Sequence, residues 1–223
     1  MSLFKKINYE DLKGFKEQNS YLSFVEREKP ERFDLFFKEL IAEPLNVNQE
    51  VFKATILEDI KDKLDSIISK KIKNNFLYNL WLKDMEHICK IFCDILNEGS
   101  ISFSLETSRS CKRYHIDNVP MRLLVTYFGK GTEWFPSHAC NYTAYYEGRP
   151  NEEIIKNFKE KRNLKPWDIA IFKGQKSEGG DKAILHRTPD EALNRKSLLM
   201  RLDSSKYISD IQAPFIKNKN NYF

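Results

Sequence analysis

Apolar residues in the first half of the chain recur mainly at helical spacing. Between Glu50 and Ile72 they fall at every third or fourth position, which predicts a helix with one buried stripe. The same period continues from Phe76 to Asn97, and Gly99 is a natural stop for that helix. Residues 10–42 are also predicted to be helical, with a break forced by Pro30. The first half therefore predicts a layer of helices.

The pattern changes to alternation after Gly99. Ile101, Phe103 and Leu105 alternate with serines, which is typical of a half-buried strand. Seven of the eight glycines and six of the eight prolines follow residue 98, so turns are concentrated there. Five further strands are predicted at residues 122–128, 141–146, 167–173, 183–186 and 196–203, and a short helix at 151–163. Short strands joined by glycine turns predict a barrel or sandwich, with the helices packed outside it.

This change of pattern divides the chain into three parts. Residues 1–98 are predicted to be a helical region that packs on the core, residues 99–205 the β-rich core, and residues 206–223 a C-terminal tail. A chain of 223 residues is near the upper limit of one compact domain, or of one domain with a helical extension. It can bury a large core without disulfides or a structural metal.

The composition is that of an ordinary globular protein, with 41% hydrophobic and 31% charged residues. No apolar run is long enough to span a membrane, and the first residues lack the apolar stretch of a secretory signal. The four cysteines are therefore interpreted as reduced thiols, and a cytoplasmic location is expected.

The net charge of +5 does not identify a partner, because the lysines are scattered. The densest run, Lys70 to Lys73, is interpreted as a solvated helix end. No DNA- or RNA-binding motif accompanies it, which argues against a nucleic-acid partner. We expect no membrane partner either.

Candidate chemistry is concentrated around His115 and Asp117, which are separated by one residue. In a strand or extended loop, residues i and i+2 project to the same side, so an imidazole and a carboxylate can converge on one cation. His186 follows an apolar stretch 71 residues downstream. Two histidines and one carboxylate form the facial triad that leaves three positions open on Fe(II). The sequence therefore predicts that His115, Asp117 and His186 are metal ligands and catalytic residues.

A second pattern follows His186. Arg195 and Ser197 resemble the pair that grips the distal carboxylate of 2-oxoglutarate, and arginine suits this task because its planar fork binds a carboxylate through two hydrogen bonds. Arg201 is an alternative, since alternation places all three residues on one face of a strand. Arg122 and Thr132 are further possible carboxylate partners.

Together these motifs resemble those of the 2-oxoglutarate- and Fe(II)-dependent dioxygenases. The closer resemblance is to a bacterial family known only as a domain of unknown function, and it covers roughly residues 75–203. The resemblance implies an α+β protein with a double-stranded β-helix (jelly-roll) core, and a hydroxylase whose unidentified substrate is a small molecule or a protein side chain. It rests on the helix segment 80–84, Cys111, His115-x-Asp117, Arg122-Leu-Leu, Thr126-Tyr127, Gly129-x-Gly131-Thr132-x-Trp134, Asp168, Phe172-Lys173-Gly174 and His186-Arg187-Thr188-Pro189.

Other interpretations of the same residues stay open. Cys111, His138 and Cys140 could join His115 in a tetrahedral zinc site, as in a non-catalytic metal-binding protein of zinc or iron homeostasis with the same fold. Asp168 is interpreted as a turn-capping residue. Aromatic side chains such as Trp134 fit a pocket lining and core packing equally well.

Overall fold

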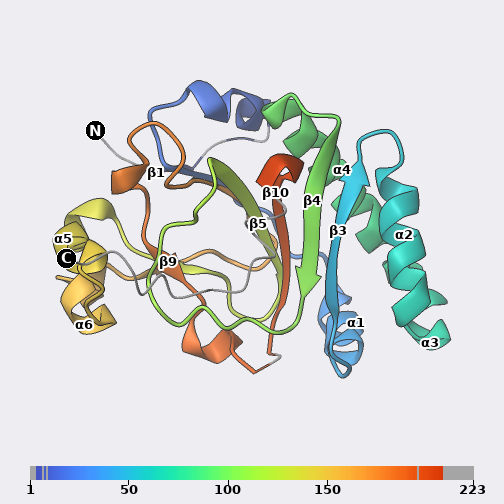
Figure 1. Ribbon diagram of the computed structural model, residues 1–223. Coiled ribbons are helices and arrows are strands. Elements are labelled where there is room, and N and C mark those ends of the chain that lie inside the picture. Colours follow the sequence, from blue (N-terminus) through green and yellow to red (C-terminus); the bar gives the residue numbers. More distant parts are fainter. Residues whose placement is uncertain (1–3, 7, 9, 195, 208–223) are drawn as a thin grey trace, which may run out of the picture.

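The computed structural model describes residues 4–6, 8, 10–194 and 196–207, and its main element is a seven-stranded sheet (Figure 1). All neighbouring strands pair antiparallel except the first two, β1 and β2, which are parallel. The strand order is β1 (Phe4–Lys6), β2 (Leu22–Val25), β8 (Ile169–Lys173), β5 (Met121–Phe128), β10 (Leu198–Ser204), β4 (Ser100–Glu106) and β3 (Asn46–Phe52).

One face of this sheet is covered by helices, as Figure 1 shows for α4 behind β4 and β10. Side chains alternate along each strand, so Leu123, Val125 and Tyr127 of β5 all point to the helices and join the largest buried cluster. The covering helices are α1 (Phe33–Leu40), α2 (Ile56–Ile67), α3 (Lys70–Lys73) and α4 (Phe76–Leu96). The main core therefore lies between the sheet and these helices.

The opposite face of the sheet meets a second, smaller sheet. Its strand order is β7 (Arg162–Asn163), β6 (Glu133–Trp134) and β9 (His186–Arg187). Leu124 of β5 and Ala170 of β8 face this side and pack with Trp134 in a separate buried cluster. Arg122 lies on the same face two residues before Leu124, so polar residues of the main sheet also point toward β9.

Short helices complete the chain around the smaller sheet and at its ends. The α-helices are α5 (Tyr142–Tyr146) and α6 (Asn151–Ile154), and the 3-10 helices are η1 (Glu10–Glu17), η2 (Ser137–Ala139), η3 (Phe158–Glu160), η4 (Gly180–Lys182), η5 (Asp190–Ala192) and η6 (Ser205–Tyr207). Among the described residues we find no helix with the length and apolar character that a membrane crossing requires.

Several predicted elements are confirmed. The helix expected from Phe76 to Asn97 is α4, and the strands expected near 101–105, 122–128, 167–173 and 196–203 are β4, β5, β8 and β10. The buried residues of α4 follow its helical period, whereas β5, β8 and β10 are apolar runs that are buried along almost their whole length. The strand expected at 183–186 is reduced to His186 and Arg187 in β9.

Four predicted elements differ from the structure. The helix expected at 151–163 is limited to α6 (Asn151–Ile154), and the last two residues of that range form strand β7. Residues 141–146 form helix α5 and not a strand, because the Asn141 side chain caps the helix by accepting a hydrogen bond from the Ala144 amide. The helix expected from Glu50 begins only at Ile56, since the preceding residues pair with β4 as strand β3. The prediction that residues 10–42 are helical is wrong for Leu22–Val25, which form strand β2 and pair with β8.

The architecture is thus a mixture of helices and mainly antiparallel sheet. The N-terminal part supplies β1, β2 and β3 to the same sheet as the core, in addition to its helices. The more specific jelly-roll assignment stays a prediction, and the predicted tail at 206–223 lies mostly outside the described residues.

Candidate metal centre

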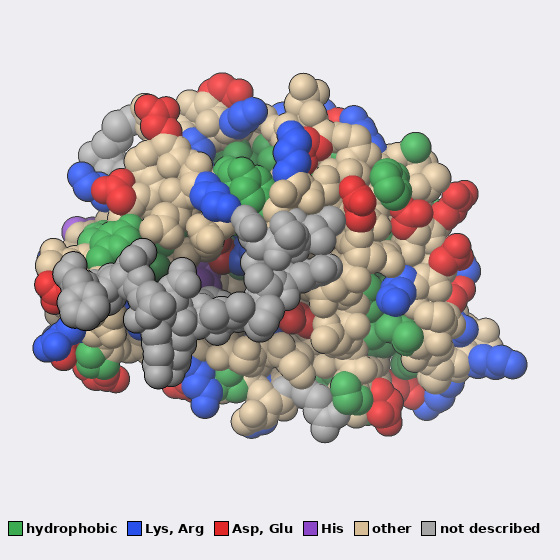
Figure 2. Space-filling model, in the orientation of Figure 1, with side chains coloured by type: hydrophobic (Ala, Val, Ile, Leu, Met, Phe, Trp, Pro, Cys, Tyr) green, Lys and Arg blue, Asp and Glu red, His purple; other side chains and the backbone are tan. Residues whose placement is uncertain are grey.

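A cavity of about 150 Å³ opens on the face of the main sheet that has no helices, beside β9. It is large enough for a small organic molecule. Most of its wall comes from β5, β9, β10 and the loop between β4 and β5. Its lining residues are Glu106, Ser108, Arg109, Ser110, Cys111, His115, Asp117, Arg122, Leu124, Thr132, His186, Arg187, Thr188, Leu199 and Arg201. Figure 2 shows acidic and basic side chains intermixed over the surface of one face, without a single-sign patch.

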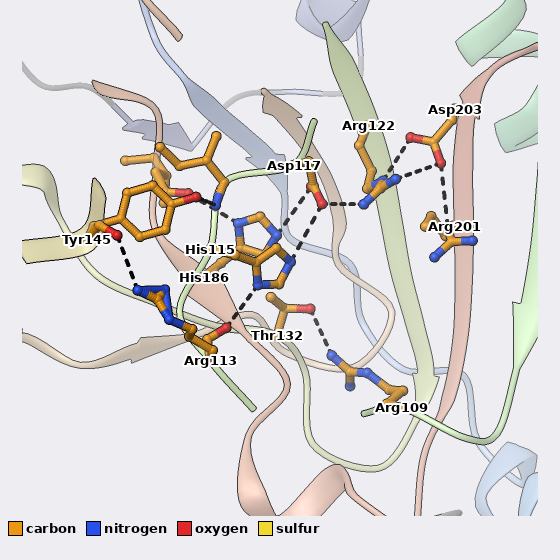
Figure 3. Close-up of polar contacts among 12 residues, drawn as sticks. Arg109, Arg113, His115, Asp117, Arg122, Thr132, Tyr145, His186, Arg201 and Asp203 are labelled. Atoms are coloured by element: carbon orange, nitrogen blue, oxygen red, sulfur yellow. Dashed lines mark hydrogen bonds and ion pairs between the residues drawn. The ribbon is translucent and has the colours of Figure 1, made fainter. Parts of the chain in front are cut away.

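The two histidines of the cavity are held together by their own backbones. His115 and His186 form an isolated antiparallel bridge, in which each amide donates to the other's carbonyl at 3.0 and 3.1 Å. The rings lie with their centroids 4.6 Å apart (Figure 3). The bridge brings two residues that are distant in the sequence to one point. Phe172 of β8 packs against the His186 ring at a centroid distance of 4.6 Å and supports it.

Both imidazoles are oriented by backbone carbonyls. The Nδ1 atom of His115 lies 3.0 Å from the Arg113 oxygen, and Nδ1 of His186 lies 3.1 Å from the Ile184 oxygen. A carbonyl oxygen only accepts hydrogen bonds, so each Nδ1 donates, and Nε2 of each ring is the nitrogen that faces Asp117. Metal-binding histidines are fixed in this way by a partner on the second nitrogen.

Asp117 completes the group from the same extended segment as His115. Its Oδ1 lies 3.7 Å from Nε2 of His115, and its Oδ2 lies 3.2 Å from Nε2 of His186. Two ligands at right angles, each about 2.1 Å from a metal, are separated by about 3 Å. Within the described part of the chain, this is the one group of three or more His, Cys, Asp or Glu residues whose ligand atoms all lie within 4.8 Å of one another.

The Asp117 carboxylate is buried and only partly satisfied. Its Oδ2 atom has no hydrogen-bond donor, whereas Oδ1 is paired with the Arg122 guanidinium. Burial alone would raise the pKa of Asp117, but Arg122 and the two imidazoles hold that pKa well below its usual range. The carboxylate is therefore ionised, and its Oδ2, which has no hydrogen-bond donor, lies 3.2 Å from Nε2 of His186. These donors suit a divalent metal ion.

Arg109 is a cavity residue that the sequence analysis did not identify. It is buried, and its Nη1 and Nη2 atoms donate to the Lys130 carbonyl at 3.0 Å and to the Thr132 hydroxyl at 3.1 Å. Among the described residues no carboxylate lies within 4.0 Å of it, and its Nε has no acceptor. Burial lowers the pKa of Arg109 to about 10, with Glu106 opposing the shift. A single arginine in a serine-rich loop carries no recognisable motif.

The predicted co-substrate residues have different outcomes. Arg195 lies outside the described residues. Ser197 does not line the cavity, because its buried hydroxyl donates to the Ala192 carbonyl at 3.0 Å. The alternation rule does not predict the direction of the Ser197 side chain, because β10 begins only at Leu198 and its register with β5 shifts between Leu198 and Leu199. The alternative Arg201 does line the cavity, as do Arg122 and Thr132.

The thiol-rich zinc alternative is not assembled by the described residues. Cys111 lines the cavity, but Cys140 is buried elsewhere and its thiol donates to the Pro136 carbonyl at 3.5 Å. His138 is exposed, with Glu160 at 3.9 Å. Asp168 caps a turn as predicted, because its Oδ2 accepts from the Lys165 amide at 2.8 Å.

The fold and site define a protein of mixed helix and antiparallel sheet with a candidate mononuclear metal centre. The family described as "Protein of unknown function (DUF1826)" matches residues 7–203, and the chain belongs to this family. No curated protein matches this chain.

The solved structures with a distant likeness include two that come from different organisms. One is a bsmA homolog from Methylobium petroleophilum PM1, with 13% identity and a TM-score of 0.32 over 62% of this chain and 54% of that chain. The other is a full-length protein of Neurospora crassa in complex with alpha-KG, with 10% identity and a TM-score of 0.35 over 87% of this chain and 78% of that chain. The chain thus covers only about half of the first of these proteins.

Proposed function

We propose that this protein is an Fe(II)- and 2-oxoglutarate-dependent dioxygenase with a jelly-roll core that hydroxylates an unidentified substrate. The observation that carries the proposal is the convergence of two imidazoles on the Asp117 carboxylate: His115 Nε2 lies 3.7 Å from Oδ1 and His186 Nε2 lies 3.2 Å from Oδ2, with the second nitrogen of each ring bonded to a backbone carbonyl. Three ligands of this kind on one side of a metal leave the other side open for a chelating co-substrate and dioxygen.

The donor set fits iron better than a structural zinc site. Closed zinc sites use four protein ligands, usually with thiolates, whereas this group offers two imidazoles, one carboxylate and an adjoining cavity. Iron in such a site supplies oxygen activation coupled to the oxidation of 2-oxoglutarate. The chain's own residues bind and orient the reactants and exclude water.

The charge of the cavity supports a doubly negative ligand. Four arginines line the cavity, and four carboxylates either line it or pair with a lining residue. Counted over the described side chains that are buried or partly buried, their positive and negative charges cancel. A divalent metal would leave an excess of two positive charges, which a dianion such as 2-oxoglutarate neutralises. The residues are Arg109, Arg122, Arg187 and Arg201, and Glu106, Asp117, Glu133 and Asp203.

Arg109 with Thr132 is the best-placed anchor for the distal carboxylate of 2-oxoglutarate. The guanidinium is buried without a carboxylate partner, and the Thr132 hydroxyl lies beside it as a second donor. Arg201 is less free, because it has Asp203 at 3.4 Å and Glu106 at 4.0 Å. The pair Arg195 and Ser197 stays a sequence-based proposal.

Anaerobic titration of the metal-free protein with Fe(II) and then 2-oxoglutarate tests the proposal. We expect a weak visible charge-transfer band that needs both components, and succinate formation once air is admitted. Replacing Fe(II) by Mg²⁺ is the control, and it should give neither signal. A protein that binds no iron, or that binds iron without the band and without succinate, would contradict the assignment.

One observation favours a second function. Cys111 lines the same cavity as the three candidate ligands, so a thiol is available near the metal and could favour zinc. A non-catalytic metal-binding protein would then result. Elemental analysis of the purified protein distinguishes the two functions: bound zinc that a Cys111→Ser variant loses supports metal handling, whereas bound iron that this variant retains supports the oxygenase.

A further inference from the structure

Arg122 connects the candidate metal centre to the main sheet through three separate nitrogen atoms. Its Nε and Nη2 donate to the two carboxylate oxygens of Asp203 at 2.8 and 3.0 Å, and its Nη1 is paired with Oδ1 of Asp117 (Figure 3). Arg122 and Asp203 are direct cross-strand partners on β5 and β10. The guanidinium is therefore fixed in the sheet and cannot follow Asp117 if that residue moves.

The two carboxylate oxygens of Asp117 therefore have different surroundings. Oδ1 is occupied by Arg122, while Oδ2 faces His186 and has no hydrogen-bond donor. A free aspartate can bind a metal through one oxygen or through both. Here the second oxygen is held away by an ion pair in a buried setting, where such pairs are strong.

We infer that Arg122 is a positioning residue that makes Asp117 a ligand through Oδ2 alone. The inference rests on the proposed metal centre and adds to it. One protein oxygen and two imidazole nitrogens would leave three coordination positions, whereas a chelating carboxylate would use one of those three. Arg122 thus preserves the room that a two-point co-substrate and dioxygen both need.

The geometry also explains why arginine stands at this position. Its planar fork places two nitrogens on Asp203 and keeps a third for Asp117, whereas a lysine ammonium is a point charge on a flexible stem. An Arg122→Lys variant keeps the positive charge and loses the fork. It therefore tests positioning separately from charge.

Co(II) bound to the full chain under anaerobic conditions is the probe, because its visible d–d bands change in intensity with coordination number. We expect Arg122→Lys to bind Co(II) about 10- to 100-fold more weakly than the wild type, with altered band intensity, as is typical when a partner of a metal ligand is lost. Asp203→Asn should shift the dissociation constant in the same direction by less, since it loosens the fork without touching Asp117.

Arg27→Lys is the matched control. Arg27 also grips an aspartate, Asp84, with its guanidinium, but it lies at the helix side of the sheet. It should change the melting temperature and leave Co(II) affinity unchanged. This separates an effect on the metal centre from a general loss of stability.

The possible results are distinguishable. A wild type that binds no Co(II) overturns the metal centre itself and the role of Arg122 with it. A wild type that binds Co(II), with a folded Arg122→Lys variant of unchanged affinity and spectrum, overturns only the role of Arg122. If Arg122→Lys does not fold, Asp203→Asn decides: unchanged affinity and spectrum overturn the inference, and weaker binding supports it.

Discussion

Two charged clusters lie on opposite faces of the main sheet, and in each an arginine guanidinium pairs with an aspartate. On the helix side, Asp84 of α4 accepts hydrogen bonds from Arg27 at 2.6 and 3.3 Å and from the Tyr127 hydroxyl at 2.8 Å. On the cavity side, Asp117 pairs with Arg122. Both oxygens of Asp84 are satisfied, whereas Oδ2 of Asp117 has no donor.

Under the proposed function, the first cluster is satisfied within the protein and stabilises the fold, whereas the second would be completed by a metal ion. A buried polar atom without a partner costs stability, so a set of them in one place needs an explanation. Three buried atoms without a hydrogen bond belong to residues that line the same cavity: Asp117 Oδ2, Arg109 Nε, and Arg201 Nε, whose partner is the ion-paired Asp203 at 3.4 Å. In the Asp84 cluster, by contrast, both carboxylate oxygens accept hydrogen bonds. Local rules are often broken at functional sites, so the three atoms at the cavity support the proposed site there.

The largest expected effect is on metal binding when one of the three ligands is removed. His186→Ala should weaken metal binding by more than the roughly 100-fold that the loss of a ligand's supporting partner causes. The fold should persist, because the His186 backbone bridge to His115 does not depend on the side chain. Co(II) titration measures the affinity and circular dichroism the fold.

His138→Ala is the matched control for this variant, since His138 is an exposed histidine outside the cavity. Its metal affinity should equal that of the wild type. Equal loss of affinity in both variants, or none in either, would show that the cavity is not the metal centre, and the contrast between the two clusters would lose its meaning.

The second expected effect is on stability, from the cluster that is complete. Asp84→Ala leaves the Arg27 guanidinium and the Tyr127 hydroxyl without their acceptor, and we expect the free energy of unfolding to fall by about 2–3 kcal/mol, less than for a fully buried pair because both charged side chains are partly exposed. Urea unfolding measures this change. Metal affinity should stay as in the wild type.

An Asp117→Asn variant makes the comparison symmetrical. It should lose metal affinity with a much smaller change in unfolding free energy, because Arg122 keeps both hydrogen bonds to Asp203. If Asp84→Ala weakened metal binding as strongly as Asp117→Asn does, the two clusters would not be independent.

The predictability of these regions from the sequence differs in the same way. Helix α4 follows a clear apolar period and β5 an apolar run rich in β-favouring residues, and the spacing of His115 and Asp117 predicts a pair of side chains that the structure brings together with His186. Strand β3 was not predicted, because its end merges with a helical period and its pairing with β4 is set by residues some fifty positions away. Pairing at such distances leaves no local pattern.

Arg109 and the Asp84 cluster could not be predicted for a related reason. Arg27 and Asp84 are separated by 57 positions, and Arg109 and Thr132 by 23. Each residue alone is an ordinary charged or polar residue in its segment. Their roles depend on which strands bring them together, and only the folded chain specifies that.

The smallest expected effect concerns Arg109 and the co-substrate. Arg109→Met removes a buried cation that meets no carboxylate within 4.0 Å among the described residues. A hydrogen bond to a charged group contributes about 1.5–3 kcal/mol, so we expect 2-oxoglutarate to bind roughly 10- to 100-fold more weakly. The charge-transfer band, followed as 2-oxoglutarate is added to the Fe(II)-loaded protein, gives the dissociation constant.

Arg109→Lys refines this last prediction, because it keeps the charge and loses the fork that reaches the Lys130 carbonyl and the Thr132 hydroxyl. Its affinity for 2-oxoglutarate should lie between those of the wild type and Arg109→Met, with Fe(II) affinity unchanged in both. A folded Arg109→Met variant that binds 2-oxoglutarate as tightly as the wild type would move the anchor to Arg201 or Arg195. The unsatisfied Nε of Arg109 would then belong with the structural features of the loop and not with the site.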